Sequence, residues 1–336
     1  MANWKSKLKA DATDWLLEAD NPSVRYFTLT QLLDKPQTDG EVQEAKAAIM
    51  NVGVVPKILS KQNSDGTWEA PTAFYTAKYK GTSWQLIILA ELGADLTDSR
   101  IRKACEFMLE NSQHHESHGF SMAKAEKTGG GRQSGVIPCL TGNVVWSLIR
   151  LGYVDDHRVQ AAVNWINTYQ RFDDADGEGA PKGWPYDKYE MCFGKHSCHM
   201  GATKALKALS EIPTEIRDRK TQDTIKTGAE YFLKHHIFKR SHNLTKVSKL
   251  GWMHFGFPLM YQTDALEILG ILTKLGYKDQ RMKETVDLVI SKQDTAGRWK
   301  LENTFNDRFQ TDIERKGENS KWITLNALTT LKQYCS

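Results

Sequence analysis

Apolar residues recur at helical spacing through most of the chain, and the alternation typical of strands is nearly absent. One such helical stripe contains Leu266, Leu269, Leu272 and Leu275. Gly276 follows it directly, and glycine at that place is a common end signal because it tolerates the left-handed conformation after a helix. The pattern predicts an all-α protein in which each helix buries an apolar face.

The predicted helices come in pairs that repeat with a period on the order of 60 residues. In each repeat an amphipathic helix leads into a polar loop with Gln, Gly and an aromatic residue, and a second helix follows. We predict one domain over residues 1–336, with repeats at roughly 5–50, 54–93, 98–152, 155–210, 218–276 and 279–334. The second, inner helices are expected to bury Leu86, Val145, Leu206, Leu266 and Leu325.

The clearest loops run from Gln62 to Trp68 and from Gln293 to Trp299. The Gln-x-x-Asp-Gly-x-Trp sequence of the first resembles the QW motif of the terpenoid cyclase and protein prenyltransferase superfamily. That resemblance implies an α/α toroid of about six helical hairpins, with inner helices around a central cavity and outer helices around them. It also implies a small-molecule or peptide substrate in the cavity. The loop has a structural use as well, because Asp-Gly makes a turn and the glutamine can bond backbone at a helix end.

Charge and composition narrow the function classes. The 45 basic and 41 acidic residues are interspersed and give a net charge of only +4, which argues against a nucleic-acid partner. No apolar run approaches the roughly 20 residues of a membrane span, and the first residues lack an apolar signal core. Five cysteines, an odd number, indicate reduced thiols. We therefore expect a cytoplasmic protein without a membrane span.

Two successive inner helices begin with residues that can bind a metal. Cys139 starts one, and Cys198 with His199 starts the next. Two thiolates and an imidazole are a typical zinc ligand set, and three protein ligands with an open fourth position are typical of a catalytic zinc. We predict a zinc ion here, with water, a substrate group or Asp264 in the fourth position.

This arrangement also resembles two families. Protein prenyltransferase β-subunits carry an Asp/Cys/His zinc site at inner-helix starts, and lantibiotic-type cyclases use a Cys followed in the next hairpin by Cys-His before Gly. Pro138–Gly142 and Ser197–Gly201 resemble the second pairing, which implies activation of a substrate thiol. Cys192 or His196 can replace one of the ligands. The alternative is that both helix-start cysteines are small buried residues and the histidine caps its helix.

The other candidate residues lie at helix starts or in neighbouring loops. As catalytic groups we predict His196, Tyr261 and Asp264. As substrate-binding groups we predict Arg25, Trp84, Lys127, Arg132, Asn143, Trp252 and Trp322. Lys127 and Arg132 belong to a glycine-rich basic segment that suits either a phosphate group or a mobile lid. Loop aromatics such as Tyr75 and Tyr79 either line a pocket or pack the walls of the ring.

The leading hypothesis is a zinc-dependent toroid enzyme that activates a substrate thiol or hydroxyl in a transferase-like or cyclase-like reaction. The first alternative is a metal-free terpenoid cyclase or prenyl-transfer enzyme. Further alternatives are a polysaccharide lyase or hydrolase, using Tyr261, His199, Asp264 and Arg25, and a binding ring without catalysis. Asp173, Asp174 and Asp176 occupy the turn of the third repeat, and we assign them to the scaffold.

Overall fold

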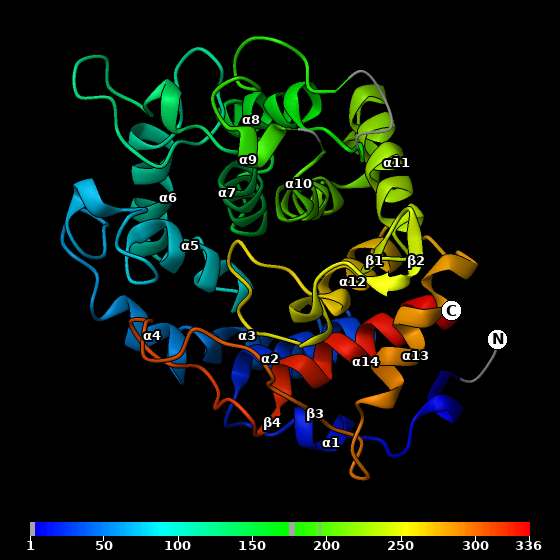
Figure 1. Ribbon diagram of the computed structural model, residues 1–336. Coiled ribbons are helices and arrows are strands. Elements are labelled where there is room, and N and C mark those ends of the chain that lie inside the picture. Colours follow the sequence, from blue (N-terminus) through cyan, green and yellow to red (C-terminus); the bar gives the residue numbers. More distant parts are fainter. Residues whose placement is uncertain (1–3, 175–178, 195) are drawn as a thin grey trace. The chain divides into compact units, whose positions relative to one another are not determined.

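The computed structural model describes residues 4–174, 179–194 and 196–336 (Figure 1). Its contacts divide the chain into two compact units. Unit 1 combines the chain up to Ser60 with Phe232–Leu259 and Thr263–Ser336, and unit 2 holds Lys61–Tyr231 and Met260–Gln262. The all-α class is confirmed, since the strands of the described residues form only two short antiparallel pairs. Whether the units act as the single domain expected from the repeats stays a prediction.

Unit 2 is a series of helical hairpins. Its helices are α5 (Thr82–Glu91), α6 (Ser99–Asn111), α7 (Pro138–Arg150), α8 (His157–Tyr169), α9 (Glu190–Phe193), α10 (His199–Glu211) and α11 (Arg219–Lys234), whose last residues pass into unit 1, with short 3-10 turns at Pro71–Ala73, Gln133–Gly135 and Thr214–Ile216. Helices α7 and α10 lie side by side, and α5 packs on the other flank of α7.

Unit 1 is built from both ends of the chain. Its N-terminal part contains a 3-10 turn at Trp4–Lys7, α1 (Thr13–Leu16), α2 (Pro22–Phe27), a π-helical turn at Thr28–Leu32, α3 (Gly40–Ile49) and α4 (Val54–Leu59). Its later part contains β1 (Lys239–Arg240), β2 (Asn243–Val247), a 3-10 turn at Leu250–Met253, α12 (Ala265–Lys274), a 3-10 turn at Gln280–Met282, α13 (Lys283–Ser291), β3 (Trp299–Lys300), β4 (Asn319–Ser320) and α14 (Lys321–Cys335). Helix α14 packs against both α12 and α2.

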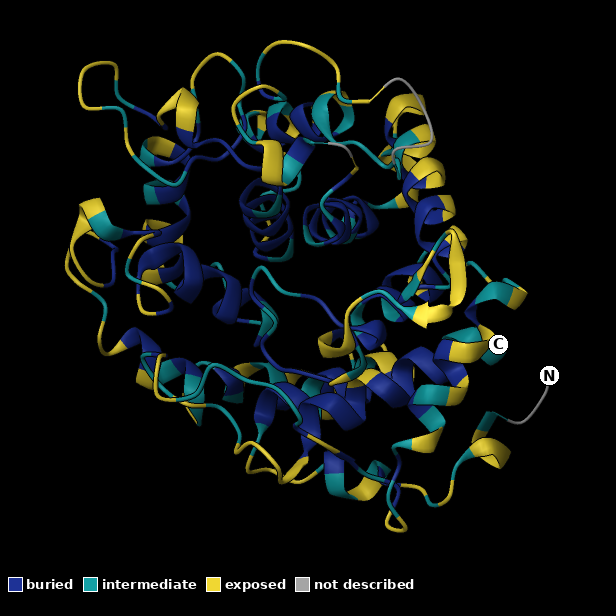
Figure 2. Cartoon of the chain, in the orientation of Figure 1, coloured by how far each residue is buried: buried dark blue, intermediate teal, exposed yellow. Residues whose placement is uncertain are grey.

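Helices that are buried almost all round alternate along the chain with amphipathic ones. Helices α5, α7 and α10 of unit 2 and α12 and α14 of unit 1 are mostly dark in Figure 2, whereas α6, α8, α11 and α13 each show an exposed face. This alternation is the one expected of inner and outer helices. The expected inner residues Leu86, Val145, Leu206, Leu266 and Leu325 are all buried.

The polar loops bind the helices in a recurring way. The backbone N–H of the loop aromatic donates to a threonine hydroxyl of the following buried helix at 3.0–3.1 Å, in the pairs Trp68–Thr82, Phe120–Thr141 and Trp299–Thr324. The loop glutamine amide donates to a carbonyl beside the next outer helix, in the pairs Gln62–Arg100, Gln113–Arg158 and Gln293–Ala10. These loops therefore have the structural use expected from the sequence, although the contacts do not establish a QW motif.

Three features of the structure differ from the simple repeat. The helix expected after Asn21-Pro22 widens into a π-helical turn, where the N–H of Leu33 bonds the carbonyl of Thr28. The degenerate fourth loop carries the small hairpin of β1 and β2. Asp176, assigned to the turn of the third repeat, lies outside the described residues. No helix in the described part of the chain is both long and apolar enough to span a membrane.

Candidate functional site

The buried helices begin at or near the residues that the sequence indicated. In unit 2, α5 begins at Thr82, α7 at Pro138, and α10 at His199 with Cys198 as its N-cap. In unit 1, Asp264 is the N-cap of α12, and α14 begins at Lys321. The predicted site residues divide between the units: Arg25, Trp252, Asp264 and Trp322 belong to unit 1, and the others to unit 2.

Unit 2 contains a cluster of four aromatic rings beside the start of α5. We call Tyr75, Tyr79, Trp84 and Tyr261 the ring cluster. The ring centre of Trp84 lies 5.0 Å from that of Tyr75, 5.1 Å from Tyr79 and 6.1 Å from Tyr261. Tyr79 and Tyr261 stack at 6.2 Å, and their hydroxyl groups are 3.2 Å apart. The structure thus brings together two predicted site residues, Trp84 and Tyr261.

A positive charge lies against this cluster. The ammonium nitrogen of Lys78 is 4.8 Å from the ring centre of Tyr75, 4.9 Å from that of Tyr261 and 5.6 Å from that of Trp84. Each distance is within the range in which the negative face of an aromatic ring attracts a cation. The cluster is therefore a place where a cation is held by several rings at once.

Buried hydrogen bonds fix the positions of the rings. The indole Nε1 of Trp84 donates to the carbonyl of Tyr75 at 2.9 Å, and the Gln85 amide donates to the carbonyl of Tyr79 at 2.8 Å. Trp84 and Tyr79 are buried, while Tyr261 is half-buried and Lys78 is exposed. The accessible side chains are thus Tyr261 of the ring cluster and Lys78 beside it.

Asn143, predicted to bind substrate, has a scaffolding contact. Its buried side-chain amide donates to the carbonyl of Met260 at 3.1 Å, next to Tyr261 in the chain.

Burial raises the pKa of the Tyr75 phenol, with smaller contributions from nearby thiols and phenols. Tyr75 therefore stays neutral in the physiological range and offers its ring rather than a phenolate.

The predicted zinc ligands do not form a metal site as they are placed. No group of three or more His, Cys, Asp or Glu side chains in the described ranges is arranged so that it can hold a metal ion. Burial raises the pKa of the Cys139 thiol to about 12, and the neighbouring Cys192 and Cys198 raise it further. Burial likewise raises the pKa of Cys192 to about 11. The arrangement of Cys139, Cys198 and His199 gives the zinc hypothesis no support, and zinc binding stays a prediction.

The two candidate histidines differ in their surroundings. His196 is exposed, and its Nδ1 lies 3.4 Å from the carbonyl oxygen of the next residue, Ser197. His199 is buried, and its ring centre lies 5.8 Å from that of Tyr231. Burial raises the pKa of Tyr231, with Asp174 and Cys198 adding to the effect.

Among the predicted residues of unit 1, Asp264 and Trp322 make contacts within the scaffold. Asp264 accepts the N–H of Glu267 on one carboxylate oxygen and the N–H of Gly256 on the other, both at 2.8 Å. This carboxylate is buried and caps α12, so it is poorly suited to abstract a proton. Trp322 stacks on Phe257 with ring centres 4.4 Å apart, and Trp252 is buried in its 3-10 turn. Arg25 is half-buried in α2.

The glycine-rich basic segment forms the tip of a hairpin-like loop. Lys124 pairs with Gly131 across it, and the N–H of Ala125 bonds the carbonyl of Gly130 at 2.9 Å. Lys127 and Arg132 are exposed on this loop. Its backbone groups thus close a turn, and a phosphate-binding role for the segment stays a prediction.

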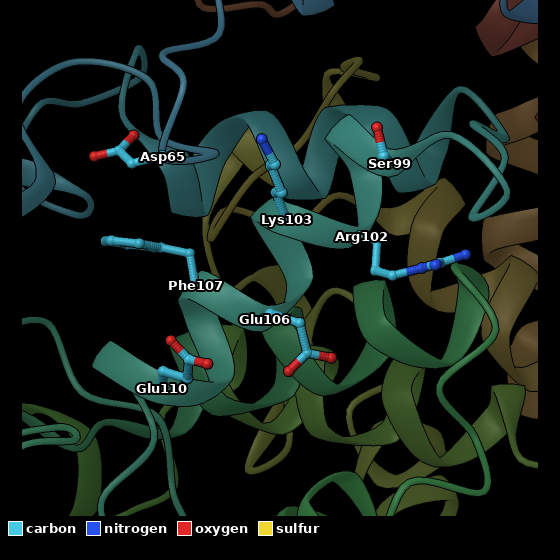
Figure 3. Close-up of a pocket in the computed structure, with 7 residues that line it drawn as sticks. All are labelled: Asp65, Ser99, Arg102, Lys103, Glu106, Phe107 and Glu110. Atoms are coloured by element: carbon cyan, nitrogen blue, oxygen red, sulfur yellow. The ribbon is translucent and has the colours of Figure 1, made fainter.

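A second surface feature of unit 2 is a hollow of about 370 Å³ along α6, lined by Asp65, Ser99, Arg102, Lys103, Glu106, Phe107 and Glu110 (Figure 3). Its polar groups are partly engaged already. Glu106 accepts from Arg158 at 2.8 Å and from Tyr153 at 2.9 Å, and Lys103 donates to the carbonyl of Ser64 at 3.1 Å. These contacts join neighbouring hairpins, so we do not choose this hollow as the site.

Sequence reasoning missed Lys78 and left Tyr75 and Tyr79 undecided. Lys78 stands in no motif, and it lies in a loop whose path depends on distant contacts. The available signal was the segment Tyr75-Thr-Ala-Lys78-Tyr79, in which a lysine stands between tyrosines shortly before a buried helix.

No protein-family model and no curated protein matches the chain. Among solved structures, it is similar to the apo form of the type II terpene cyclase MstE from Scytonema, with a TM-score of 0.42 and 13% identity over 93% of this chain and 87% of that chain. It is similar also to an MstE variant in complex with its substrate, geranylgeranyl dihydroxybenzoate, with a TM-score of 0.40 and 13% identity over 94% and 87% of the two chains. Likeness at this level assigns neither a family nor an activity to this chain.

Proposed function

We propose that the chain is a metal-independent enzyme of the terpenoid-cyclase or prenyl-transfer type, which holds a cationic intermediate of a long apolar substrate against the ring cluster. The supporting observation is the ammonium of Lys78, which lies 4.8–5.6 Å from three ring centres. Such a contact is worth about 0.5–1 kcal/mol at exposed sites and about 2 kcal/mol or more when the cation is desolvated. A carbocation, which water would destroy, benefits most from the desolvated case.

The chemistry of the cluster suits such an intermediate. Its polar groups are phenols and an indole, and the Tyr75 phenol is kept protonated by burial. Neutral rings stabilise positive charge through their faces without adding a strong nucleophile that would trap it. The isoprenoid class of substrate is the one that the resemblance of the Gln62–Trp68 loop implies.

The other hypotheses have less to support them. The zinc enzyme lacks geometric support, because no group of three or more His, Cys, Asp or Glu side chains in the described ranges is arranged to hold a metal ion. A lyase or hydrolase would use Tyr261, His199, Asp264 and Arg25 to abstract and donate protons. Both oxygens of the Asp264 carboxylate are engaged by backbone N–H groups.

The test is an activity screen in a chelating buffer. Purified protein is incubated with geranyl, farnesyl and geranylgeranyl diphosphates, and with a geranylgeranylated aromatic acid, and products are identified by mass spectrometry. We expect cyclised or transferred products with EDTA present. Tyr261→Leu should lower turnover by about tenfold or more, since one lost cation–π contact of about 1.4 kcal/mol corresponds to that factor.

Tyr186→Leu is the matched control, because Tyr186 is also a half-buried tyrosine of unit 2 but lies outside the ring cluster. It should keep its turnover. Products that form only after a divalent metal is added would contradict metal independence. Equal loss of turnover in the two variants would contradict the role of the cluster.

A further inference from the structure

Three other lysines that lie over aromatic rings each pair with an acidic side chain, whereas Lys78 forms no ion pair with the described residues. Lys207 lies over Trp146 and pairs with Glu91 at 2.6 Å, and Lys292 lies over Phe255 and pairs with Glu302 at 2.5 Å. The same holds for Lys321, which lies over Trp15 and pairs with Glu18 at 2.8 Å.

The ammonium of Lys78 forms no hydrogen bond or ion pair with any residue of the described ranges. An ammonium has three N–H donors, and none of them is used in a hydrogen bond to the described residues. The side chain is exposed, so these donors are accessible to a ligand from solvent. The rings thus hold a cation in place while its capacity to bind an anion is left unused.

The start of α5 adds to the positive potential near this lysine. Helix α5 begins at Thr82, four residues after Lys78, with no side-chain cap at Gly81 and no acidic residue in its first turn. The N-terminal end of a helix carries a partial positive charge that favours anions. An anion bound by Lys78 would therefore meet no nearby acidic side chain of this helix end.

We propose that Lys78 anchors the anionic headgroup of the substrate, a carboxylate or a phosphate, while the apolar chain of the same molecule lies along Tyr261 and the neighbouring rings. This inference rests on the proposed function and names its substrate class: an amphiphile with a negatively charged end. Binding of the headgroup draws the ammonium toward the anion, and the ring faces become available to the carbon chain. A charge-assisted hydrogen bond to an ammonium is stronger than one between neutral groups.

The test compares ligands that share one apolar chain and differ in the head. Farnesol, farnesoic acid and farnesyl thiodiphosphate, which resists loss of its headgroup, are titrated calorimetrically in EDTA-containing buffer. The proteins are the natural chain, Lys78→Met, Lys78→Arg and the neighbouring-lysine control Lys80→Met. Circular dichroism confirms that each variant is folded.

We expect the natural chain to bind at least one anionic ligand about tenfold more tightly than farnesol, equivalent to about 1.4 kcal/mol. Lys78→Met should reduce this ratio to near one without changing the affinity for farnesol, whereas Lys78→Arg and Lys80→Met should keep it. The anionic ligand that binds more tightly shows whether the site prefers a carboxylate or a diphosphate headgroup. An anion preference that survives in Lys78→Met, or is absent in the natural chain, overturns the inference but not the proposed function. Failure of every ligand to bind overturns both.

Discussion

Asn143 and Met260 are 117 residues apart, yet the side-chain amide of the first donates to the carbonyl of the second at 3.1 Å. Asn143 lies on the buried helix α7, and Met260 precedes Tyr261 of the ring cluster. The short segment Met260–Gln262 thereby joins unit 2, although the chain on both sides of it belongs to unit 1. One buried hydrogen bond thus helps to place the half-buried ring of the candidate site.

Asn143→Ala should therefore lower both stability and activity. The buried carbonyl of Met260 would lose its donor, which costs about 1–3 kcal/mol of the free energy of unfolding. Urea unfolding measures this change. Hydrogen–deuterium exchange of the backbone amides in residues 260–262 should also become faster. Asn167→Ala, which removes a half-buried bond to Thr221 elsewhere in unit 2, is the control and should leave that segment protected. Unchanged exchange at 260–262 in Asn143→Ala would contradict the positioning role.

The arrangement of helices could be read from the sequence because it depends on local signals. Apolar spacing, Leu-Gly endings and polar loops located α5, α7 and α10 close to their observed starts at Thr82, Pro138 and His199. These signals report the period of burial along one helix. They are insensitive to the direction of individual side chains, which tertiary packing decides.

The candidate site was harder to predict for that reason. Asn143 was expected to face a substrate, but its amide faces the carbonyl of Met260. Asp264 was expected to do chemistry, but it caps α12. Lys78 carried no motif, and only the folded path of its loop places it over three rings. Contacts between distant segments leave no periodic trace in the sequence.

Gln293 should be important for the N-terminal segment of unit 1. It is buried, its side-chain oxygen accepts the N–H of Lys9 at 2.7 Å, and its amide donates to the carbonyl of Ala10 at 3.2 Å. Gln293→Ala should cost about 1–2 kcal/mol, because two backbone groups lose their partner. Thermal unfolding measures the loss, and hydrogen exchange should rise from Lys9 through α1. Gln160→Ala, which removes an exposed bond from α8 to the loop before it, should change neither.

The cysteine cluster of unit 2 gives a chemical test of the zinc hypothesis. Because burial raises the pKa of Cys139 to about 12 and that of Cys192 to about 11, these thiols should be protonated at neutral pH. The thiolate is the reactive form. Alkylation by iodoacetamide, followed by mass spectrometry, should be slow at both and should accelerate as the pH rises. A chelator should have no effect; a chelator-dependent increase with release of stoichiometric zinc would instead establish a thiolate metal site.

Glu314 should make the stability of unit 1 depend on pH. Burial raises the pKa of this carboxyl, although it accepts hydrogen bonds from Ser320 and from the N–H groups of Lys321 and Trp322, which act in the opposite direction. A carboxyl with a raised pKa in the folded state favours folding most when it is protonated. Its contribution is complete below the ordinary glutamate pKa of about 4.3 and is lost as the pH rises through the raised value.

Glu314→Gln removes this titration while keeping an acceptor for the start of α14. We expect the stability of the natural chain to fall relative to the variant as the pH increases from about 4 to neutrality. Chemical unfolding at several pH values measures the difference. A difference that stays constant with pH, or that changes in favour of the natural chain, would contradict a raised pKa.

The two described aspartates of the third repeat should respond differently to substitution. Asp173 forms a two-bond pair with Arg171, both contacts at 2.6 Å, and the guanidinium also donates to the carbonyl of Gly194 at 2.7 Å. Asp173→Asn should cost about 1 kcal/mol, a modest value because this pair is partly exposed. Asp174→Asn should leave turnover within a few-fold once the activity screen yields an assay, since we assign this turn to the scaffold. A fall in turnover of several orders of magnitude in Asp174→Asn, with stability unchanged, would show that the aspartate takes part in the chemistry.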